Sequence, residues 1–243
     1  MQTERQPVFL PSGDRAMVVE FGAEIDPEIN ALVHRTTAAI EHAQLDGVIE
    51  LVPTYRSLML HYNPLLTRPD TLQQAILSLD VDDSGEATDQ RVVEIPTLYG
   101  GEYGPDIGFV AENAGMSESE VIEIHSGMDY LVYAMGFSPG FPYLGGLDPR
   151  LNTPRLTTPR TLIPGGSVGI AETQTGAYPV ASPGGWQLIG RTPLKLFDPE
   201  SDPPAVINAG DRVRFVPLPD EDAYKETERQ VQDGIYSVVT RNI

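Results

Sequence analysis

Hydrophobic side chains in the first eighty residues follow two different periods. In residues 16–21, Ala16 and Val18 alternate with bulkier neighbours, a period of two that is typical of a strand. From Ile29 to Ile40 the apolar positions recur at three- and four-residue spacing, which predicts a helix. Asp26 and Pro27 precede this run as a capping side chain and a proline at the first helical position.

The same kind of pattern continues to about residue 80. Residues 48–55 and 57–63 are predicted to be strands, with a Ser-Gly-Asp turn separating two earlier strands within 8–21. A second helix is expected to begin at Pro69 and to bury Leu72, Ile76 and Leu79. The order strand, strand, helix, strand, strand, helix predicts a small two-layer α/β sandwich.

Residues 81–90, VDDSGEATDQ, are acidic, small and without hydrophobic period, which predicts a linker. Beyond it we expect a strand over 91–99, a short helix over 107–116, and a second helix that Ser117 and Glu120 begin as a capping box. A strand over 129–137 follows, and short strands between turns up to about residue 217 fit a barrel or a pair of curved sheets. A final helix is expected around 221–230.

The predicted fold class is therefore α+β, with a small N-terminal two-layer α/β domain over residues 1–82 and a β-rich domain over residues 90–243. The second domain contains a segment, residues 136–193, that is crowded with glycine and proline. Aromatic and aliphatic residues are interspersed through it, unlike a disordered linker. We expect it to form a concave surface from loops and short strands. Its recurring polar residues are Ser138, Arg155, Arg160, Ser167, Gln174, Tyr178, Ser182, Gln187 and Arg191.

Composition excludes several classes of protein. The chain has 243 residues and no cysteine, so disulfides, thiolate nucleophiles and cysteine metal sites are excluded. It has no apolar run long enough for a membrane span, and its start does not resemble a signal peptide. We therefore expect a cytoplasmic protein without a metal site.

The chain carries a net charge of -19, with Lys and Arg together numbering only 16. Most of these are arginine, because Lys195 and Lys225 are the only lysines. A strongly acidic surface repels itself in dilute buffer and is screened in strong salt. We therefore expect a host with a salty cytoplasm, and we do not expect nucleic acid as a partner.

Candidate chemistry begins with His125 and three arginines. His125 closes a predicted helix just before the glycine- and proline-rich segment, where the helix C-terminus alone would favour a histidine. Arg155, Arg160 and Arg191 lie in the loop-rich part of an acidic chain, where they could hold a carboxylate or phosphate. A purely structural role, as ion pairs with Asp148 or Asp198, remains an alternative for each arginine. Trp186 fits either a core position or a lid over a small ligand.

Known nucleotide and hydrolase motifs are missing. The glycine turns at 164–167 and 183–186 do not match the P-loop or dinucleotide-binding patterns, although their amides could form an anion-binding nest. No G-x-S-x-G motif accompanies Ser167 or Ser182.

Several long blocks resemble one known family. GFSPGFPYLGGLDPRL, PRLTTPRTLIPGGSVGIAETQTGAYP and SPGGWQLIGRTP are similar to the KipI/allophanate hydrolase subunit 1 family, whose members are also called the B subunit of 5-oxoprolinase. GDRAMVVEFG, IPTLYGGEYGPD and GDRVRFVPL extend the resemblance over nearly the whole chain. One departure is Gly165, where the family commonly has alanine.

The resemblance implies a cyclophilin-like β-barrel for the C-terminal domain and a non-autonomous subunit of an enzyme. It implies two partners, a sister subunit of the KipA/allophanate hydrolase subunit 2 type (the C subunit) and an A subunit. Together these would open the lactam of 5-oxo-L-proline to L-glutamate with ATP and Mg as co-substrate. Other branches imply a urea/allophanate-type amidohydrolase or carboxyltransferase, or an inhibitor that binds a sensor histidine kinase.

The candidate catalytic residues are His125, Arg155 and Arg160. The candidate substrate-binding residues are Ser138, Gly165, Gly166, Ser167, Gln174, Tyr178, Gly184, Gly185, Trp186, Gln187 and Arg191.

Overall fold

The computed structural model describes residues 7–81 and 91–242 of the chain. The chain divides into two compact units, Met1–Asp89 and Gln90–Ile243, and each is described by itself. The linker predicted over residues 81–90 lies almost wholly outside the described residues.

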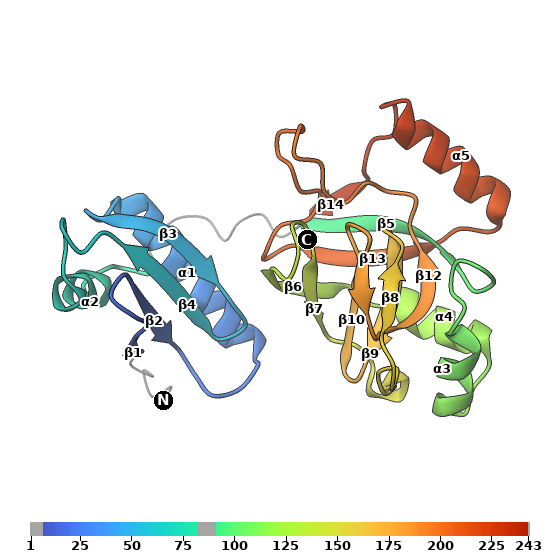
Figure 1. Ribbon diagram of the computed structural model, residues 1–243, viewed down its shortest axis with the longest axis horizontal. Helices are drawn as coiled ribbons and strands as arrows, with labels where there is room; N and C mark the ends of the chain where they lie inside the picture. The colour runs from blue at the N-terminus through green and yellow to red at the C-terminus, as the bar shows by residue number, and fades with distance from the viewer. Residues whose placement is uncertain (1–6, 82–90, 243) are drawn as a thin grey trace. The chain divides into compact units, whose positions relative to one another are not determined.

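The N-terminal unit is a four-stranded antiparallel sheet covered on one face by two helices (Figure 1). Its elements are β1 (Val8–Pro11), β2 (Ala16–Glu20), α1 (Pro27–Ala43), β3 (Val48–Pro53), β4 (Ser57–Tyr62) and α2 (Pro69–Leu77), and the sheet order is β1-β2-β4-β3. The predicted strand and helix order is confirmed. Leu58 and Leu60 alternate inward on β4 and meet Val33 and Ile40 of α1 in one hydrophobic core.

Helix α1 begins where the sequence indicates. The Asp26 carboxylate accepts hydrogen bonds from the amides of Glu28 at 2.8 Å and Ile29 at 3.1 Å, and Pro27 occupies the first turn. The helix ends at Gln44, which adopts a left-handed conformation.

The C-terminal unit contains a closed barrel of seven strands. In hydrogen-bonding order these are β12 (Gln187–Arg191), β9 (Ser167–Ala171), β10 (Gln174–Ala177), β7 (Pro142–Gly145), β6 (Tyr130–Met135), β13 (Arg212–Pro217) and β5 (Arg91–Tyr99). The pairs Gly190–Tyr99 and Arg191–Leu98 join β12 to β5 and close the ring. The pairing of β13 with β5 is parallel. Closure removes the exposed edges that an open sheet would present.

Short elements surround the barrel (Figure 1). They are α3 (Ile107–Ala114), α4 (Glu118–Ser126), the 3-10 turn η1 (Pro149–Leu151), the two-stranded sheet of β8 (Arg160–Ile163) and β11 (Ser182–Gly184), α5 (Glu221–Gln232) and β14 (Thr240–Asn242). The capping box of Ser117 and Glu120 is present at the start of α4. Strand β14 extends the sheet beside β5, where Arg241 binds the Asp129 carboxylate at 2.8 Å.

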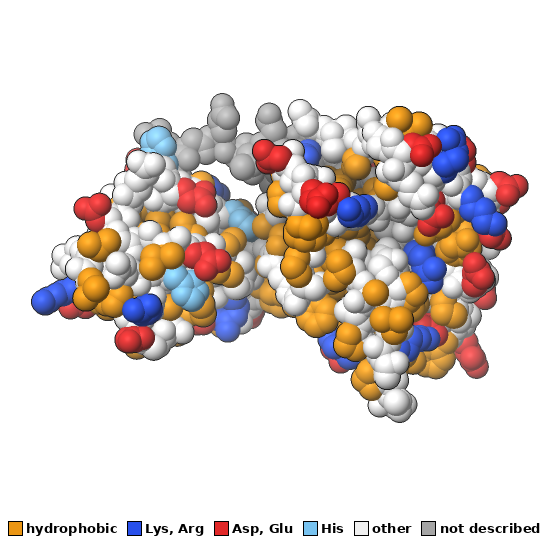
Figure 2. Space-filling view, turned by 45° about the horizontal axis from the view of Figure 1, so that its top comes forward, with side chains coloured by type: hydrophobic (Ala, Val, Ile, Leu, Met, Phe, Trp, Pro, Cys, Tyr) orange, Lys and Arg blue, Asp and Glu red, His pale blue; other side chains and the backbone are white. Residues whose placement is uncertain are grey.

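The predicted fold class, a small α/β sandwich followed by a β-barrel, is confirmed, and of the two alternatives the barrel is the correct one. Within the described residues, no helix combines the length and apolarity that crossing a bilayer requires. On the face shown in Figure 2, Lys and Arg side chains are scattered among acidic ones.

Candidate functional site

An aromatic cluster supports the glycine- and proline-rich segment on the outer face of the barrel. Trp186, Tyr178 and Phe141 meet edge to face, with ring centroids 5.5–6.0 Å apart. Glycines make this packing possible, because a side chain at Gly169 or Gly176 would press on Trp186 at 3.3 Å. Trp186 is only 7% exposed, so the core interpretation of this residue is correct and the lid interpretation is not.

The loop that holds Arg155 and Arg160 runs against the turn at Gly184 and Gly185. The amide of Leu156 donates to the Gly185 carbonyl at 2.7 Å. The absence of a side chain at Gly184 leaves space for the Tyr178 hydroxyl, which would lie 2.6 Å from an added Cβ. Arg155, Arg160, Tyr178, Gly184 and Gly185 therefore lie close together, and the concave surface expected from the sequence stays a prediction.

Tyr178 lies beneath this face in the aromatic cluster. Burial raises the pKa of its phenol to about 12, against the opposing charges of Arg155 and Arg160. The hydroxyl is therefore protonated at neutral pH. Within residues 7–81 and 91–242 this hydroxyl makes no hydrogen bond, and the side chain is only 2% exposed, so Tyr178 supports the face from within the aromatic cluster.

The two arginines differ in how firmly they are held. Arg160 donates to the Asp106 carboxylate at 2.7 Å and to the Trp186 carbonyl at 3.2 Å. Arg155 is half exposed, and its guanidinium lies 3.9 Å from Glu172. Neither pairs with Asp148 or Asp198, which bind Arg150 and Lys195 instead. Arg155 is thus the cation more available to a ligand. Arg160 is held in place by Asp106 and the Trp186 carbonyl.

Asp106 is a residue that the sequence analysis missed. It precedes α3, and its second carboxylate oxygen accepts from the amide of Leu188 at 2.6 Å. It thereby fixes strand β12 and Arg160 together. The Gly-Pro-Asp sequence directly before a predicted helix is the signal that points to it.

A second group lies beside Tyr178 on the same outer face. Ser167 is paired with Arg191 on β12, and its carbonyl accepts from the amide of Tyr178 at 2.9 Å. Opposed residues of neighbouring strands share a face, so the three side chains form a row. The Ser167 hydroxyl and the Nε of Arg191 are buried without a hydrogen-bond partner in the described part of the chain. The Arg191 guanidinium also lies 5.5 Å from the ring of Tyr103.

The glycines before Ser167 shape this turn. Gly166 has a φ of 81°, and a side chain there would overlap the Thr192 carbonyl. Its amide donates to Tyr178 and its carbonyl accepts from Thr192, so this backbone is committed to structure. Gly165 is exposed, and an added Cβ would lie 3.5 Å from the Pro179 carbonyl, in ordinary contact. An alanine at this position, as the family commonly has, fits the available space.

Three other predicted residues are placed differently. Gln187 is buried, and its side-chain amide donates to the Pro154 carbonyl at 2.9 Å, which ties the arginine loop to β12. Gln174 is partly buried at the start of β10, in the hairpin that carries Glu172. Ser138 belongs to the loop between β6 and β7, outside the arginine face.

His125 lies inside the barrel, fully buried. Thr175 donates to the Gly169 carbonyl at 3.0 Å, so its oxygen accepts from Nε2 of His125 at 2.8 Å. Nδ1 then accepts from the Tyr99 hydroxyl at 2.8 Å. Burial lowers the pKa of His125 to about 3, so the ring is neutral. Because both nitrogens are occupied and no edge is exposed, the expected catalytic role of His125 is not retained.

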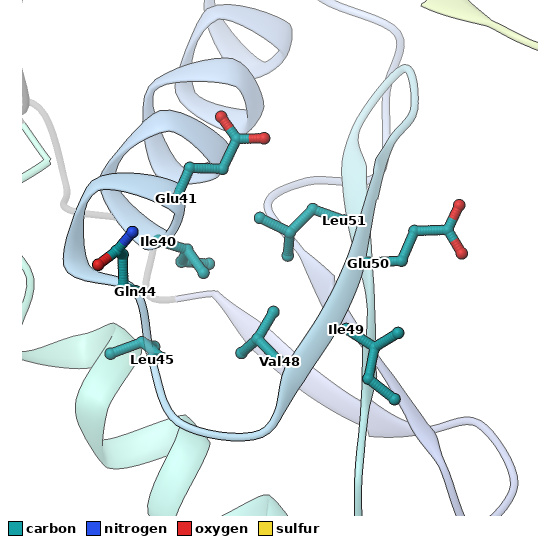
Figure 3. Close-up of a pocket in the computed structure, with 8 residues that line it drawn as sticks. All are labelled: Ile40, Glu41, Gln44, Leu45, Val48, Ile49, Glu50 and Leu51. Atoms are coloured by element: carbon teal, nitrogen blue, oxygen red, sulfur yellow. The ribbon is translucent and has the colours of Figure 1, made fainter.

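Two surface cavities lie away from these residues. One, of about 400 Å³, separates the end of α1 from β3 in the N-terminal unit and is lined by Ile40, Glu41, Gln44, Leu45, Val48, Ile49, Glu50 and Leu51 (Figure 3). The other, of about 430 Å³, lies at α4 and η1. Neither is lined by a predicted site residue. In the described residues no group of three His, Asp or Glu side chains has the arrangement of a metal site.

The outer face of the barrel thus offers arginines to an anionic ligand, with the buried phenol of Tyr178 beneath them. The one histidine of the C-terminal unit is sealed inside the barrel. Such a face is suited to bind and orient a carboxylate or phosphate.

Comparison with known proteins identifies the family. Residues 7–207 match the family described as "Carboxyltransferase domain, subdomain C and D". The chain is 46% identical over 228 residues to the 5-oxoprolinase B subunit of Bacillus subtilis, covering 88% of this chain and 95% of that protein. It is 41% identical over 208 residues to the 5-oxoprolinase B subunit of Escherichia coli O157:H7, covering 84% and 93%. The chain belongs to this family, as its sequence blocks indicate.

Solved structures extend the comparison. The protein TTHA0988 superposes with a TM-score of 0.76 at 36% identity, over 85% of this chain but only 40% of that longer chain. The Kluyveromyces lactis urea amidolyase superposes with a TM-score of 0.78 over 100% of this chain and 17% of that chain. Its identity of 20% shows a shared fold alone.

Proposed function

We propose that this chain is the B subunit of an ATP-dependent 5-oxoprolinase that hydrolyses 5-oxo-L-proline to L-glutamate together with its A and C subunits. The observation that carries the proposal is its 46% identity to a 5-oxoprolinase B subunit across 95% of that protein's length. The composition of the arginine face agrees with a non-autonomous role. It supplies groups that bind anions, while the only histidine of the unit is enclosed in the barrel.

The chemistry explains what such a face contributes. A five-membered lactam is an unreactive amide, and transfer of a phosphoryl group from ATP to its oxygen makes the ring carbon open to attack by water. Cations and hydrogen-bond donors stabilise the charge that develops on the oxygen and on the transferred phosphate. The substrate also carries a carboxylate, which an arginine binds well.

Arg155 is the group best placed for these tasks. Arg155 is half exposed and has only a distant carboxylate partner, at 3.9 Å. Tyr178 lies beneath it with a protonated hydroxyl and is 2% exposed. Arg160 supports them as a cation fixed by Asp106. ATP, with Mg, is co-substrate of the assembled complex in this proposal.

The urea or allophanate branch is the second candidate. It is favoured by the carboxyltransferase description of the family and by the fold shared with a urea amidolyase. The arginine face would then bind the carboxylate of allophanate or a carboxylated carrier. A cytoplasm rich in salt remains the proposed setting, because the chain carries a net charge of -19.

Reconstitution tests the proposal. This chain is mixed with partners of the A and C types from the same organism in molar KCl, and ATP-dependent release of glutamate from 5-oxo-L-proline is measured with each of the three omitted in turn. We expect turnover only when all three are present. An assembled complex that turns over urea or allophanate and not 5-oxo-L-proline would favour the second candidate.

One substitution tests the site within that assay. Arg155→Ala should lower turnover by more than tenfold, because it removes the available cation. Arg229→Ala is the matched control, since Arg229 is an equally exposed arginine that pairs with Glu226 on α5. Arg160→Ala is a poorer test, because it also leaves Asp106 without its ion partner. Unchanged turnover in Arg155→Ala would remove this face from the site.

A further inference from the structure

Ser167 on β9 and Arg191 on β12 bring two polar groups together on the outer face of the barrel. Ser167 is fully buried, and Arg191 is the residue opposite it on the neighbouring strand. The Ser167 hydroxyl and the Nε of Arg191 are shielded from solvent, and neither has a hydrogen-bond partner among the described residues. A buried donor without an acceptor loses its hydrogen bonds to water and gains none in exchange. Two such groups side by side indicate a position that another molecule fills.

Arg191 also takes part in no ion pair within residues 7–81 and 91–242. Arg160, by contrast, pairs with Asp106 at 2.7 Å. Carboxylates are plentiful in this chain, because Asp and Glu number 35 against 16 Lys and Arg. A charged group that is partly removed from water is stabilised by an opposite charge, and for Arg191 a ligand can supply it.

Neighbouring residues hold this arginine in place. Its guanidinium lies over the Tyr103 ring, 5.5 Å from the ring centroid. That ring packs on Tyr224 of α5, with the two centroids 4.6 Å apart. The stem of Arg191 is confined by Gly166, where an added Cβ would lie 3.3 Å from its Cγ. A guanidinium over a ring keeps its N–H donors, which lie in its own plane, available to an anion.

The free donors favour a carboxylate over a phosphate. The Gly166 amide donates to the Tyr178 carbonyl at 2.6 Å. The Ser167 amide donates to the Pro164 carbonyl at 3.3 Å. These two amides are therefore not available to form the phosphate-binding nest that a glycine turn can provide. One hydroxyl and one guanidinium remain, and together they match the two oxygens of a carboxylate.

We infer that Ser167 and Arg191 bind the carboxylate group of the substrate, with the hydroxyl donating to one oxygen and the guanidinium to the other. The identity of that substrate, 5-oxo-L-proline, rests on the proposed function. A carboxylate in this position satisfies both unpartnered donors and neutralises the arginine.

Tyr178 connects this pair to the loop of Arg155 and Arg160. Its amide donates to the Ser167 carbonyl at 2.9 Å, and the charges of the two arginines oppose the effect of burial on the pKa of its phenol. A carboxylate held by Arg191 leaves Arg155 to the charge that develops on the lactam oxygen and on the transferred phosphate.

Binding of the acid and of its neutral amide to the isolated full chain tests the inference. Isothermal titration calorimetry with 5-oxo-L-proline and 5-oxo-L-prolinamide should show the amide binding about tenfold more weakly, because it lacks the charge. Arg191→Gln should weaken binding of the acid about tenfold and leave binding of the amide unchanged. Arg150→Gln is the matched control, since Arg150 is an arginine of the same unit that pairs with Asp148, and it should leave both unchanged.

Ser167→Ala separates a binding role from a structural one. It should weaken binding of the acid, because one donor is lost. The urea midpoint of the ligand-free variant should equal or exceed that of the wild type, since the hydroxyl that it removes has no partner in the described residues. A lowered midpoint with unchanged binding would mean that the free protein satisfies this hydroxyl, a bound water included, and would overturn the inference.

The remaining outcomes separate the carboxylate site from the proposed function. Equal affinity for the acid and the amide, or unchanged affinity for the acid in Arg191→Gln, would overturn the site and leave the proposed substrate in place. Cyclopentanecarboxylate has the carboxylate but no lactam. If it binds through Arg191 and 5-oxo-L-proline does not bind, the site stands and the proposed substrate is wrong. If none of the three compounds binds, the site is wrong, whatever the reconstituted complex hydrolyses.

Discussion

The N-terminal sheet and the glycine- and proline-rich segment of the barrel are held together in opposite ways. In the sheet, side chains do the packing, and Leu58 and Leu60 fit under Val33 of α1. In the segment, backbone packs against backbone or ring, and Gly166 and Gly169 are placed where a side chain would strike a carbonyl or Trp186. Side-chain packing tolerates exchange between residues of similar volume. Close approach of the backbone at a glycine does not tolerate replacement by any residue with a side chain.

Two buried polar side chains, one in each unit, differ in whether they have hydrogen-bond partners. In the barrel, His125 has a partner on each ring nitrogen. In the N-terminal unit, Thr36 is buried at 1% exposure and its hydroxyl has no hydrogen-bond partner in the described residues. A satisfied buried group stabilises a fold, and an unsatisfied one destabilises it. Substitution of His125 should therefore lower the free energy of unfolding, whereas removal of the Thr36 hydroxyl should raise it.

Gly166→Ala should have the largest effect. A left-handed φ and an overlap with the Thr192 carbonyl together should lower the free energy of unfolding by at least ~3 kcal/mol. Gly146→Ala is the control, since Gly146 has a φ of 96° but open space around it, and it should lose only about 1 kcal/mol. Urea unfolding followed by Trp186, the single tryptophan, reports on the barrel alone. Equal losses would show that conformation, and not close approach, sets the requirement for glycine.

Acid should destabilise the barrel through His125. Because burial holds the folded pKa at about 3 and the unfolded value is 6.5, the unfolded chain takes up the proton first as the pH falls. The contribution of His125 to the free energy of unfolding should therefore be fully present above pH 6.5. Below that pH it should fall by about 1.4 kcal/mol per pH unit, or about 2 kcal/mol by pH 5.

His125→Gln is the comparison for this pH profile. It should be less stable than the wild type at pH 7, since it loses one of the two hydrogen bonds. Its stability should change less between pH 6.5 and 5, because glutamine does not titrate. Parallel profiles for the two proteins, measured by Trp186 fluorescence, would contradict the assignment.

Thr36→Val should have the smallest effect and the opposite sign. Removing an unpartnered hydroxyl should raise the stability of the N-terminal unit by about 0.5–1 kcal/mol. The neighbouring Thr37→Val is the control. The Thr37 hydroxyl donates to the Val33 carbonyl at 2.8 Å, so its removal should lower the stability of the N-terminal unit. Hydrogen exchange of the α1 amides measures both. A loss of protection in Thr36→Val would show that the hydroxyl has a partner in solution.

The sequence predicts the N-terminal unit better than it predicts the barrel. Alternation at residues 16–21 and helical spacing at 29–40 define the N-terminal unit, because each signal is local and repeats. The closure of the barrel leaves no such signal. It depends on Gly190 and Arg191 meeting Tyr99 and Leu98, residues about ninety positions away in the chain, on strands too short to show a period.

The sequence predicts that the candidate arginines lie in one loop-rich segment, but it does not predict how each arginine is held. Glycine, proline and arginine in residues 136–193 indicate the loops in which Arg155, Arg160, Gly184 and Gly185 lie close together. Sequence could not distinguish Arg160, held by Asp106 from fifty-four residues away, from the more available Arg155. Nor could it show that His125 faces the barrel interior, because a helix end beside a strand exposes or encloses its last turn according to tertiary packing.

Strand β14 has a practical consequence for handling the protein. Strand β12 pairs with β5 only at Leu98 and Tyr99, and β14 covers the same edge from Arg91 to Val93. An uncovered edge of this kind invites pairing between molecules and the growth of aggregates. Residues 240–242 therefore cover an edge of the sheet. A shortened chain that lacks them would expose this edge of β5, and we expect it to aggregate more readily when it is concentrated.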